Sequence, residues 1–180
     1  MTIYIALLRS INVSGHNKIK MAELRCTMEA IGLSRVQTYI QSGNVLFESE
    51  EGPEQVRLRI ENEIRTVFGI SSTVILRTTE ELEQILAASP YAGVTLAKGE
   101  SIHVSLLNEV PPQKAVDFLE GSERENDEYY IHGRDIYFLL RQSILDSKLA
   151  KSMQKLGDIA TTRNWNTINK LAALARAMQT

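Results

Sequence analysis

The chain has few of the residues that carry thiol and metal chemistry. Its 180 residues include one cysteine and three histidines. The single cysteine, Cys26, has no partner for an intramolecular disulfide, which excludes a disulfide-stabilised secreted scaffold and fits a reducing cytoplasm. His16, His103 and His132 lack the spacing of metal ligands. We therefore expect no metal site, and we expect Cys26 to be a partly buried helical thiol.

Long apolar runs and an excess of charge are missing as well. The longest early apolar run, Ile3 to Leu8, is too short for a signal peptide or a membrane helix, and Arg9 ends it. The net charge of −2 and the pI near 6.0 argue against a general binder of nucleic acids or membrane surfaces. We expect a soluble cytoplasmic protein with no membrane or nucleic-acid partner, and nothing in the sequence sets its oligomeric state.

Catalytic and phosphate-binding motifs are also absent. The chain contains neither GxxxxGK[ST] nor GxGxxG, the two glycine-rich patterns that cradle nucleotide phosphates. No neighbouring residues combine Ser, His and Asp or a pair of carboxylates in a recognisable catalytic arrangement. The sequence therefore predicts no catalytic residue and no cofactor, and it leaves open whether the protein is an enzyme.

What the chain does have is an internal repeat. Tyr39–Phe47 (YIQSGNVLF) aligns without a gap with Tyr130–Phe138 (YIHGRDIYF), at an offset of 91 residues. Ile3–Arg9 (IYIALLR) aligns with Ile102–Asn108 (IHVSLLN), at an offset of 99 residues. Self-similarity at a long offset is typical of a duplicated structural unit. The first copy holds eight more residues than the second between its matched segments.

The apolar patterns of the first half alternate between strand and helix. They predict β-α-β-β-α-β, which is the order of a ferredoxin-like plait. The predicted elements are a strand at Ile3–Leu8, a helix at Met21–Ile31, a hairpin of Val36–Gln41 with Val45–Phe47, a helix at Pro53–Phe68 and a strand at Val74–Leu76.

The second half repeats this order incompletely. A helix at Glu80–Ala88 and a glycine-containing linker at Tyr91–Glu100 separate the halves, and no strand pattern follows Arg141. We predict an α+β fold of two tandem ferredoxin-like units from an internal duplication, the second lacking a final strand, plus a C-terminal helix. The expected domains are residues 1–90 and 101–180. The second is expected to hold a strand at Ile102–Leu107, a helix at Gln113–Leu119, a hairpin at Glu128–Leu140 and helices at about Lys148–Leu156 and Asn164–Met178.

One loop is longer than its connection requires. In a plait the loop after the first strand and the turn of the hairpin share one edge, so Arg9–Lys20 should meet Ser42–Asn44. The equivalent loop of the second half is only about Asn108–Pro111. The long loop reads RSINVSGHNKIK, with several hydrogen-bond donors and no carboxylate. Such a loop before a helix can hold an anion, although a solvated surface loop is the alternative.

A second polar segment precedes the last helix. Thr161–Thr167 reads TTRNWNT, in which a threonine could cap the helix and Trp165 could either stack on a planar ligand or anchor the helix. Residues 1–25 carry a net charge of +3 and residues 141–180 a net charge of +5. We therefore predict that the two basic segments form one anion site, the alternative being solvated charges on separate surfaces.

Three of these segments resemble a known family. ALLRSINVSGHNKIKM, TYIQSGNVLF and TTRNWNT are similar to the signature segments of the bacterial domain-of-unknown-function family 1697. The usual first motif of that family reads LLRGINVGG, so Ser10 and Ser14 stand here in place of glycines. The replacements argue against close approach of a ligand to the backbone at these two points. The resemblance implies a pair of ferredoxin-like halves and no established activity.

The leading functional hypothesis is a cytoplasmic protein that binds a small anionic metabolite. One alternative is an enzyme acting on a phosphorylated or carboxylated metabolite, and another is a protein- or RNA-interaction module. The predicted ligand-binding residues are Arg9, Asn12, Lys18, Lys20, Ser42, Asn44, Arg163, Asn164, Trp165 and Asn166.

Overall fold

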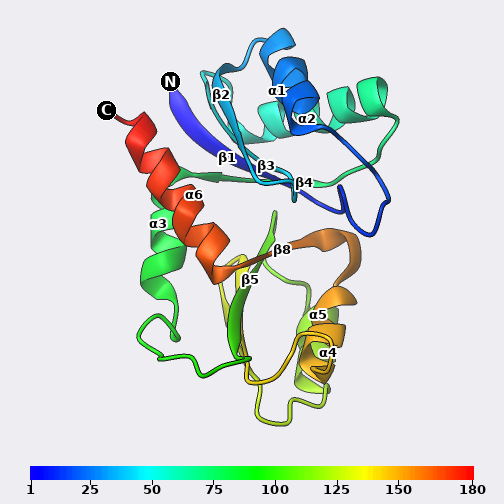
Figure 1. The fold of residues 1–180 in the computed structure, drawn as a ribbon, viewed down its shortest axis with the longest axis vertical. Coiled ribbons are helices and arrows are strands. Elements are labelled where there is room, and N and C mark those ends of the chain that lie inside the picture. The colour runs from blue at the N-terminus through cyan, green and yellow to red at the C-terminus, as the bar shows by residue number, and fades with distance from the viewer. The chain divides into compact units, whose positions relative to one another are not determined.

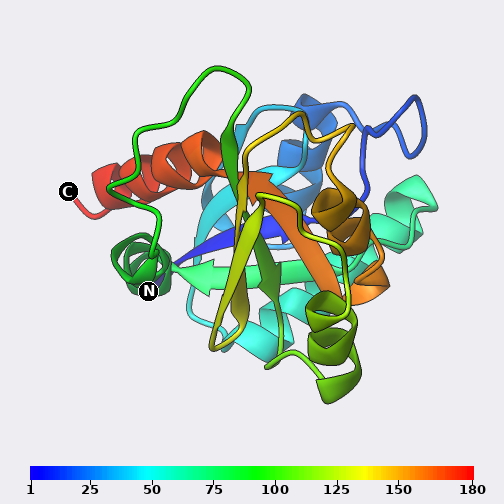
Figure 2. The same cartoon turned by 90° about the horizontal axis from the view of Figure 1, so that it is seen from below.

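The computed structural model describes residues 1–180, apart from the side chain of Asp158. It has an α+β fold with two four-stranded antiparallel sheets, ordered β2-β3-β1-β4 and β6-β7-β5-β8 (Figures 1 and 2). The strands are β1 (Thr2–Leu8), β2 (Ser34–Tyr39), β3 (Asn44–Ser49), β4 (Val74–Thr78), β5 (Ser101–Leu107), β6 (Glu128–His132), β7 (Asp135–Leu140) and β8 (Ala160–Asn164). The helices are α1 (Met21–Ala30), α2 (Pro53–Phe68), α3 (Thr79–Ala88), α4 (Gln113–Glu120), α5 (Lys148–Gln154) and α6 (Trp165–Met178), with a short 3₁₀ turn at Gly157–Ile159.

The chain divides into two compact units, each built around one sheet. Unit 1 comprises Met1–Leu82 together with Leu171–Thr180, and unit 2 comprises Glu83–Lys170. The second half of α6 thus belongs to unit 1, and the second half of α3 belongs to unit 2.

In unit 1, α1 and α2 pack against one face of the sheet (Figure 1). The helix α2 begins at Pro53, where a missing N–H costs nothing, and ends at Gly69, which takes the left-handed conformation. Its buried residues Val56, Ile60 and Ile64 recur at helical spacing and join the core beside Phe47 of β3.

In unit 2, α4 and α5 take the same places on the second sheet. Leu119 of α4 and Leu149 of α5 are buried in one core with Phe138 of β7. The helix α5 is capped by Ser147, whose Oγ accepts a hydrogen bond of 3.0 Å from the N–H of Ala150. Figure 2 shows α4 and α5 next to each other.

The repeat seen in the sequence reappears in the strand register. Tyr4 pairs with Phe47 across β1 and β3, and His103 pairs with Phe138 across β5 and β7, which are the same positions after offsets of 99 and 91 residues. The same offsets relate two backbone hydrogen bonds. Leu8 N–H donates to Gly43 C=O at 2.8 Å in unit 1, and Leu107 N–H donates to Arg134 C=O at 3.0 Å in unit 2. The pair β1–β3 of the first sheet and the pair β5–β7 of the second sheet therefore have the same register.

The gapless alignment of the hairpins is wrong on their first strand. Tyr39 pairs with Asn44, whereas Tyr130 pairs with Tyr137. The turn between β2 and β3 has four residues, 40–43, and the turn between β6 and β7 has two, 133–134. A turn that is two residues shorter moves the register of the preceding strand, so Tyr39 and Tyr130 are not equivalent.

The prediction that the second half lacks a final strand is also wrong. Ala160–Asn164 forms β8, an edge strand that pairs only with β5, and its Thr162 Oγ1 lies 2.6 Å from Ser105 Oγ on that strand. Because the segment carries threonine and arginine, it has no apolar run. The helix α6 begins at Trp165, since the Oδ1 of Asn164 caps it by accepting from Thr167 N–H at 2.8 Å.

Candidate functional site

The loop Arg9–Lys20 and the β2–β3 turn meet at one edge of the first sheet, as the sequence predicts. Besides the bond between Leu8 and Gly43, the Nδ2 of Asn12 donates to Gln41 C=O at 2.8 Å. Gly43 has a φ of +90°, and a Cβ at this position would lie 2.6 Å from Cδ1 of Ile11. Ile11 is almost fully buried. The loop is therefore packed against the turn through its side chains as well as bonded to it.

The amide of Asn12 holds the loop in shape. Its Oδ1 accepts from Ile19 N–H at 2.8 Å, and its Nδ2 donates to Ile19 C=O at 3.1 Å. Its own N–H donates to Asn17 C=O at 3.0 Å, and the Nδ2 of Asn17 donates to Ser10 C=O at 2.9 Å. Asn12, which we predicted as a ligand-binding residue, thus has a structural task within the loop.

The loop backbone is unusual. Ser10, Asn12, Ser14 and Asn17 have φ values of +56°, +54°, +49° and +52°, in the left-handed region that glycine occupies without strain. The glycines of the family's first motif correspond to Ser10 and Ser14. Those glycines are thereby explained by backbone conformation, so their replacement here gives no information about a ligand.

The cations of the loop are presented at its surface. Lys18 and Lys20 are exposed, and neither forms an ion pair with any side chain that the structure describes. Arg9 is half-buried, with Nη1 donating to Ser10 Oγ at 3.0 Å. Its backbone is fixed by Thr73 C=O, which accepts from Arg9 N–H at 3.0 Å, and by Ser72 Oγ, which donates to Arg9 C=O at 2.6 Å. Arg9 thus projects from a fixed backbone.

Ser42 and Asn44 close the neighbouring turn. Asn44 is fully buried, and its Nδ2 donates to Tyr39 C=O and to Ser42 Oγ, each at 3.0 Å. Ser42 is half-buried. The structure therefore brings Arg9, Asn12, Lys18, Lys20, Ser42 and Asn44 to one edge of unit 1.

The second predicted segment lies in unit 2. Arg163 is buried in β8, where its Nη1 donates to Thr162 C=O at 3.0 Å and burial lowers the pKa of the guanidinium to about 10. Asn164 caps α6, Trp165 is its half-buried first residue, and Asn166 is exposed. Because the two segments belong to different units, the common anion site stays a prediction.

Sequence reasoning missed a counterpart of Arg163 in unit 1. Arg77 of β4 pairs with Ile5, and Arg163 of β8 pairs with Val104, which is the equivalent of Ile5. Arg77 is also buried and donates through Nη1 to the preceding carbonyl, that of Leu76, at 2.9 Å. An alignment of residues 76–82 (LRTTEEL) with residues 162–168 (TRNWNTI), in which the arginine is second in each segment, would have indicated this correspondence.

Both arginines precede a capped helix. In unit 1, Thr78 and Glu81 form a capping box: Glu81 N–H donates to Thr78 Oγ1 at 3.2 Å, and Thr78 N–H donates to Glu81 Oε1 at 2.9 Å. In unit 2, Asn164 has the corresponding position before α6. The repeat therefore includes the strand, the arginine, the cap and the helix that follows.

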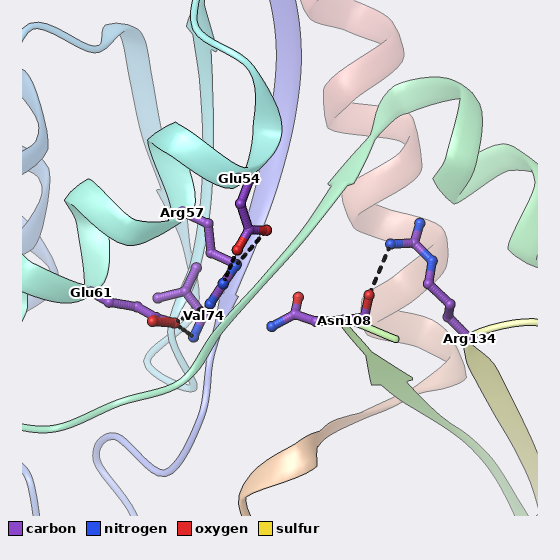
Figure 3. Close-up of polar contacts among 6 residues, drawn as sticks. All are labelled: Glu54, Arg57, Glu61, Val74, Asn108 and Arg134. Atoms are coloured by element: carbon purple, nitrogen blue, oxygen red, sulfur yellow. Dashed lines mark hydrogen bonds and ion pairs between the residues drawn. The ribbon is translucent and has the colours of Figure 1, made fainter. Parts of the chain in front are cut away.

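Some other charges of unit 1 form ion pairs with one another. Arg57 of α2 pairs with Glu54 and, at 2.8 Å, with Glu61, whose Oε2 also accepts from Val74 N–H at 3.1 Å (Figure 3). The hydrogen bond from Arg57 lowers the pKa of Glu54. This cluster ties the start of β4 to α2, so its charges have a structural role.

The equivalent connection of unit 2 is short. Arg134 Nη1 donates to Asn108 C=O at 3.4 Å, where β5 ends (Figure 3). The helix α4 then begins at Gln113. The connection between β5 and α4 therefore needs only a few residues, whereas the connection between β1 and α1 in unit 1 spans Arg9–Lys20.

Three further features concern the cysteine, metal binding and membrane helices. Cys26 is exposed on α1, contrary to the partly buried thiol that we expected, because it faces away from the buried residues Leu24 and Met28. Among the side chains that the structure describes, no group of three or more His, Cys, Asp or Glu could hold a metal ion. No helix in the described chain has both the length and the apolar character needed to cross a membrane.

Comparison with known proteins identifies the family. Residues 1–137 match the family described as "Protein of unknown function (DUF1697)", and the chain belongs to it. The structure is similar to that of the conserved bacterial protein SP0830 from Streptococcus pneumoniae, with a TM-score of 0.81 and 27% sequence identity over 97% of this chain and 98% of that chain. No curated protein matches.

Proposed function

We propose that this protein binds a small anionic metabolite, phosphorylated or carboxylated, at the edge of unit 1 formed by Arg9–Lys20 and the β2–β3 turn. Its single cysteine is compatible with a cytoplasmic location. The observation that carries the proposal is the loop itself, which is long, strained, fixed and free of carboxylates.

Backbone strain at several positions requires a reason. Left-handed non-glycine residues cost about 1 to 3 kcal/mol each and concentrate at binding and catalytic sites. Here Ser10, Asn12 and Ser14 have positive φ, and the intervening Ile11 and Val13 do not. Because the N–H of Asn12 donates to Asn17 C=O within the loop, the strained backbone positions the side chains of the loop around a ligand rather than offering its own N–H groups. A plain connection between β1 and α1 would not need this strain.

The charge around the loop favours an anion. The exposed Lys18 and Lys20 follow the loop tip at Gly15, and no Asp or Glu lies between Arg9 and Lys20. Ammonium groups on a fixed loop attract phosphate and carboxylate oxygens through charge-assisted hydrogen bonds.

Thermal shift measurements test this proposal. Inorganic phosphate, pyrophosphate and citrate are added to the wild type and to the variant Lys18→Gln/Lys20→Gln. We expect a saturable rise in Tm for at least one anion, corresponding to about 2.7 kcal/mol at 100 times Kd, and its loss in the variant. Lys98→Gln removes one exposed charge of unit 2 and serves as the control. Equal shifts in all three proteins would exclude the loop as the binding site.

The predicted participation of Arg163–Asn166 is tested separately. Asn166 is exposed, so Asn166→Ala perturbs this segment without disturbing the buried Arg163. If the two segments share a ligand, Arg9→Ala and Asn166→Ala each weaken the binding of the same anion, and the double variant is non-additive. Additive effects, or no effect of Asn166→Ala, would confine the site to unit 1.

We also propose that the two units are ferredoxin-like products of an internal duplication. The shared β-α-β-β-α-β order, the common register of the central strands and the equivalence of Arg77 with Arg163 support this origin. Under this proposal residues 1–90 and 101–180 approximate the two copies. The anion loop is then an elaboration of the first copy alone.

A further inference from the structure

Unit 2 carries an apolar groove whose lining includes none of the predicted ligand-binding residues. It lies between α4 and residues 155–159, which follow α5, and has a volume of about 540 Å³. A smaller cavity of about 290 Å³ continues from it, since Pro112 and Ile159 line both. The volume of the groove is in the range of small-molecule sites.

Large apolar side chains remain exposed around this groove. Phe118 is 42% exposed, Ile159 is 40% exposed, and Val110 in the smaller cavity is 68% exposed. The core of unit 2 uses other residues of α4, namely Leu119 and Ala115, so Phe118 is not needed there. Exposed apolar residues gathered in one concave place usually mark a binding site.

Two lysines flank the aromatic end of the groove. Lys114 is one helical turn before Phe118, and the Nζ of Lys155 lies 5.9 Å from the centre of the Phe118 ring. Among the described side chains, neither lysine forms an ion pair. Asp117 also lines the groove, but its Oδ1 accepts from Gln113 Nε2 at 2.8 Å, and Glu109 lies in the smaller cavity. The charged side chains around Phe118 therefore have a net positive charge, and the groove is apolar beyond this end.

We propose that this groove binds a small amphiphilic carboxylate, with an aliphatic or aromatic body. The carboxylate is held between Lys114 and Lys155, and the apolar body lies over Leu156 and Ile159 toward Val110. The assignment follows from charge complementarity at one end of an otherwise apolar groove. It involves none of the residues of the proposed anion loop, so either proposal can fail without the other.

An NMR titration of the full chain with octanoate tests the inference. We expect saturable ¹H–¹⁵N shifts confined to residues around α4 and 155–159. The double variant Lys114→Gln/Lys155→Gln should weaken octanoate by at least about tenfold, because the loss of even one charge-assisted interaction has that effect. Its affinity for neutral 1-octanol should stay within about twofold. Ile159→Ser should weaken both ligands, and Lys98→Gln, which lines neither cavity, should weaken neither.

Three results would overturn the inference. One is the absence of saturable shifts with octanoate. Another is equal binding of octanoate, 1-octanol and octyltrimethylammonium, which would leave the lysines without a role. The third is a dimer that light scattering detects without ligand and that Ile159→Ser abolishes, because the groove would then be covered by a second copy of the chain.

Discussion

Gly43→Ala is the sharpest test of how the loop and the turn are joined. Alanine at a φ of +90° costs about 1 to 2 kcal/mol. The new Cβ would lie 2.6 Å from Cδ1 and 2.8 Å from Cγ1 of buried Ile11, an overlap whose relief costs about another 1 to 3 kcal/mol. The reduced entropy of the unfolded chain offsets about 0.5 to 1 kcal/mol. The free energy of unfolding should therefore fall by about 1 to 4.5 kcal/mol.

Urea unfolding followed by circular dichroism measures this loss. The matched control is Gly133→Ala in the β6–β7 turn, where φ is +60° and a Cβ would meet nothing within 4 Å. Only the conformational cost remains there, about 0 to 1.5 kcal/mol after the same offset. In combination with Ile11→Ala, which removes the overlapping atoms, Gly43→Ala should cost at least about 1 kcal/mol less than it does alone. Equal losses for Gly43→Ala and Gly133→Ala would refute the packing of the loop on the turn.

Three further outcomes are expected. Ser10→Gly and Ser14→Gly should each raise the free energy of unfolding by about 0.5 to 1 kcal/mol in urea titrations, because relief of left-handed strain exceeds the entropy cost of glycine; a loss of stability would contradict the strain. Cys26→Ser, on the exposed face of α1, should change stability by less than about 0.5 kcal/mol and leave anion binding intact. Burial lowers the pKa of His103, so the unfolded chain binds the proton more readily than the folded chain. The free energy of unfolding should therefore decline as the pH falls below about 6.5. His103→Gln should flatten that decline, and an unchanged pH profile would exclude His103 as its source.

The elements that the sequence predicts well are those with strong apolar periodicity. The buried positions of α2 recur every three to four residues between Pro53 and Gly69, so both its existence and its ends can be inferred. The meeting of the loop with the β2–β3 turn follows from strand direction alone, because β1 and β2 both run antiparallel to β3. The position of the proposed anion loop beside the β2–β3 turn can therefore be predicted from the sequence.

What the sequence leaves open depends on partners distant in the chain. The strand β8 is defined by its pairing with β5, and only the β-branched Thr161 and Thr162 hint at it. The roles of polar residues are equally hidden: Asn12 could donate to a ligand or to its own loop, and only the geometry shows the bonds to Ile19. The groove in unit 2 joins Phe118 with Ile159, which no local pattern relates.

The assignment of the second half of α6 to unit 1 has a consequence for synthesis on the ribosome. Met178 C=O accepts a hydrogen bond of 2.7 Å from Arg35 Nη1, so a side chain of β2 obtains a partner that is translated long after it. Conversely, Tyr137 of β7 donates through its hydroxyl to Ile85 C=O of α3 at 2.6 Å, a residue translated before β7 exists. Domains usually fold in the order in which they emerge. Here Leu171–Thr180 is translated after nearly all of the second unit, so the first unit cannot gain the contacts of that segment until then.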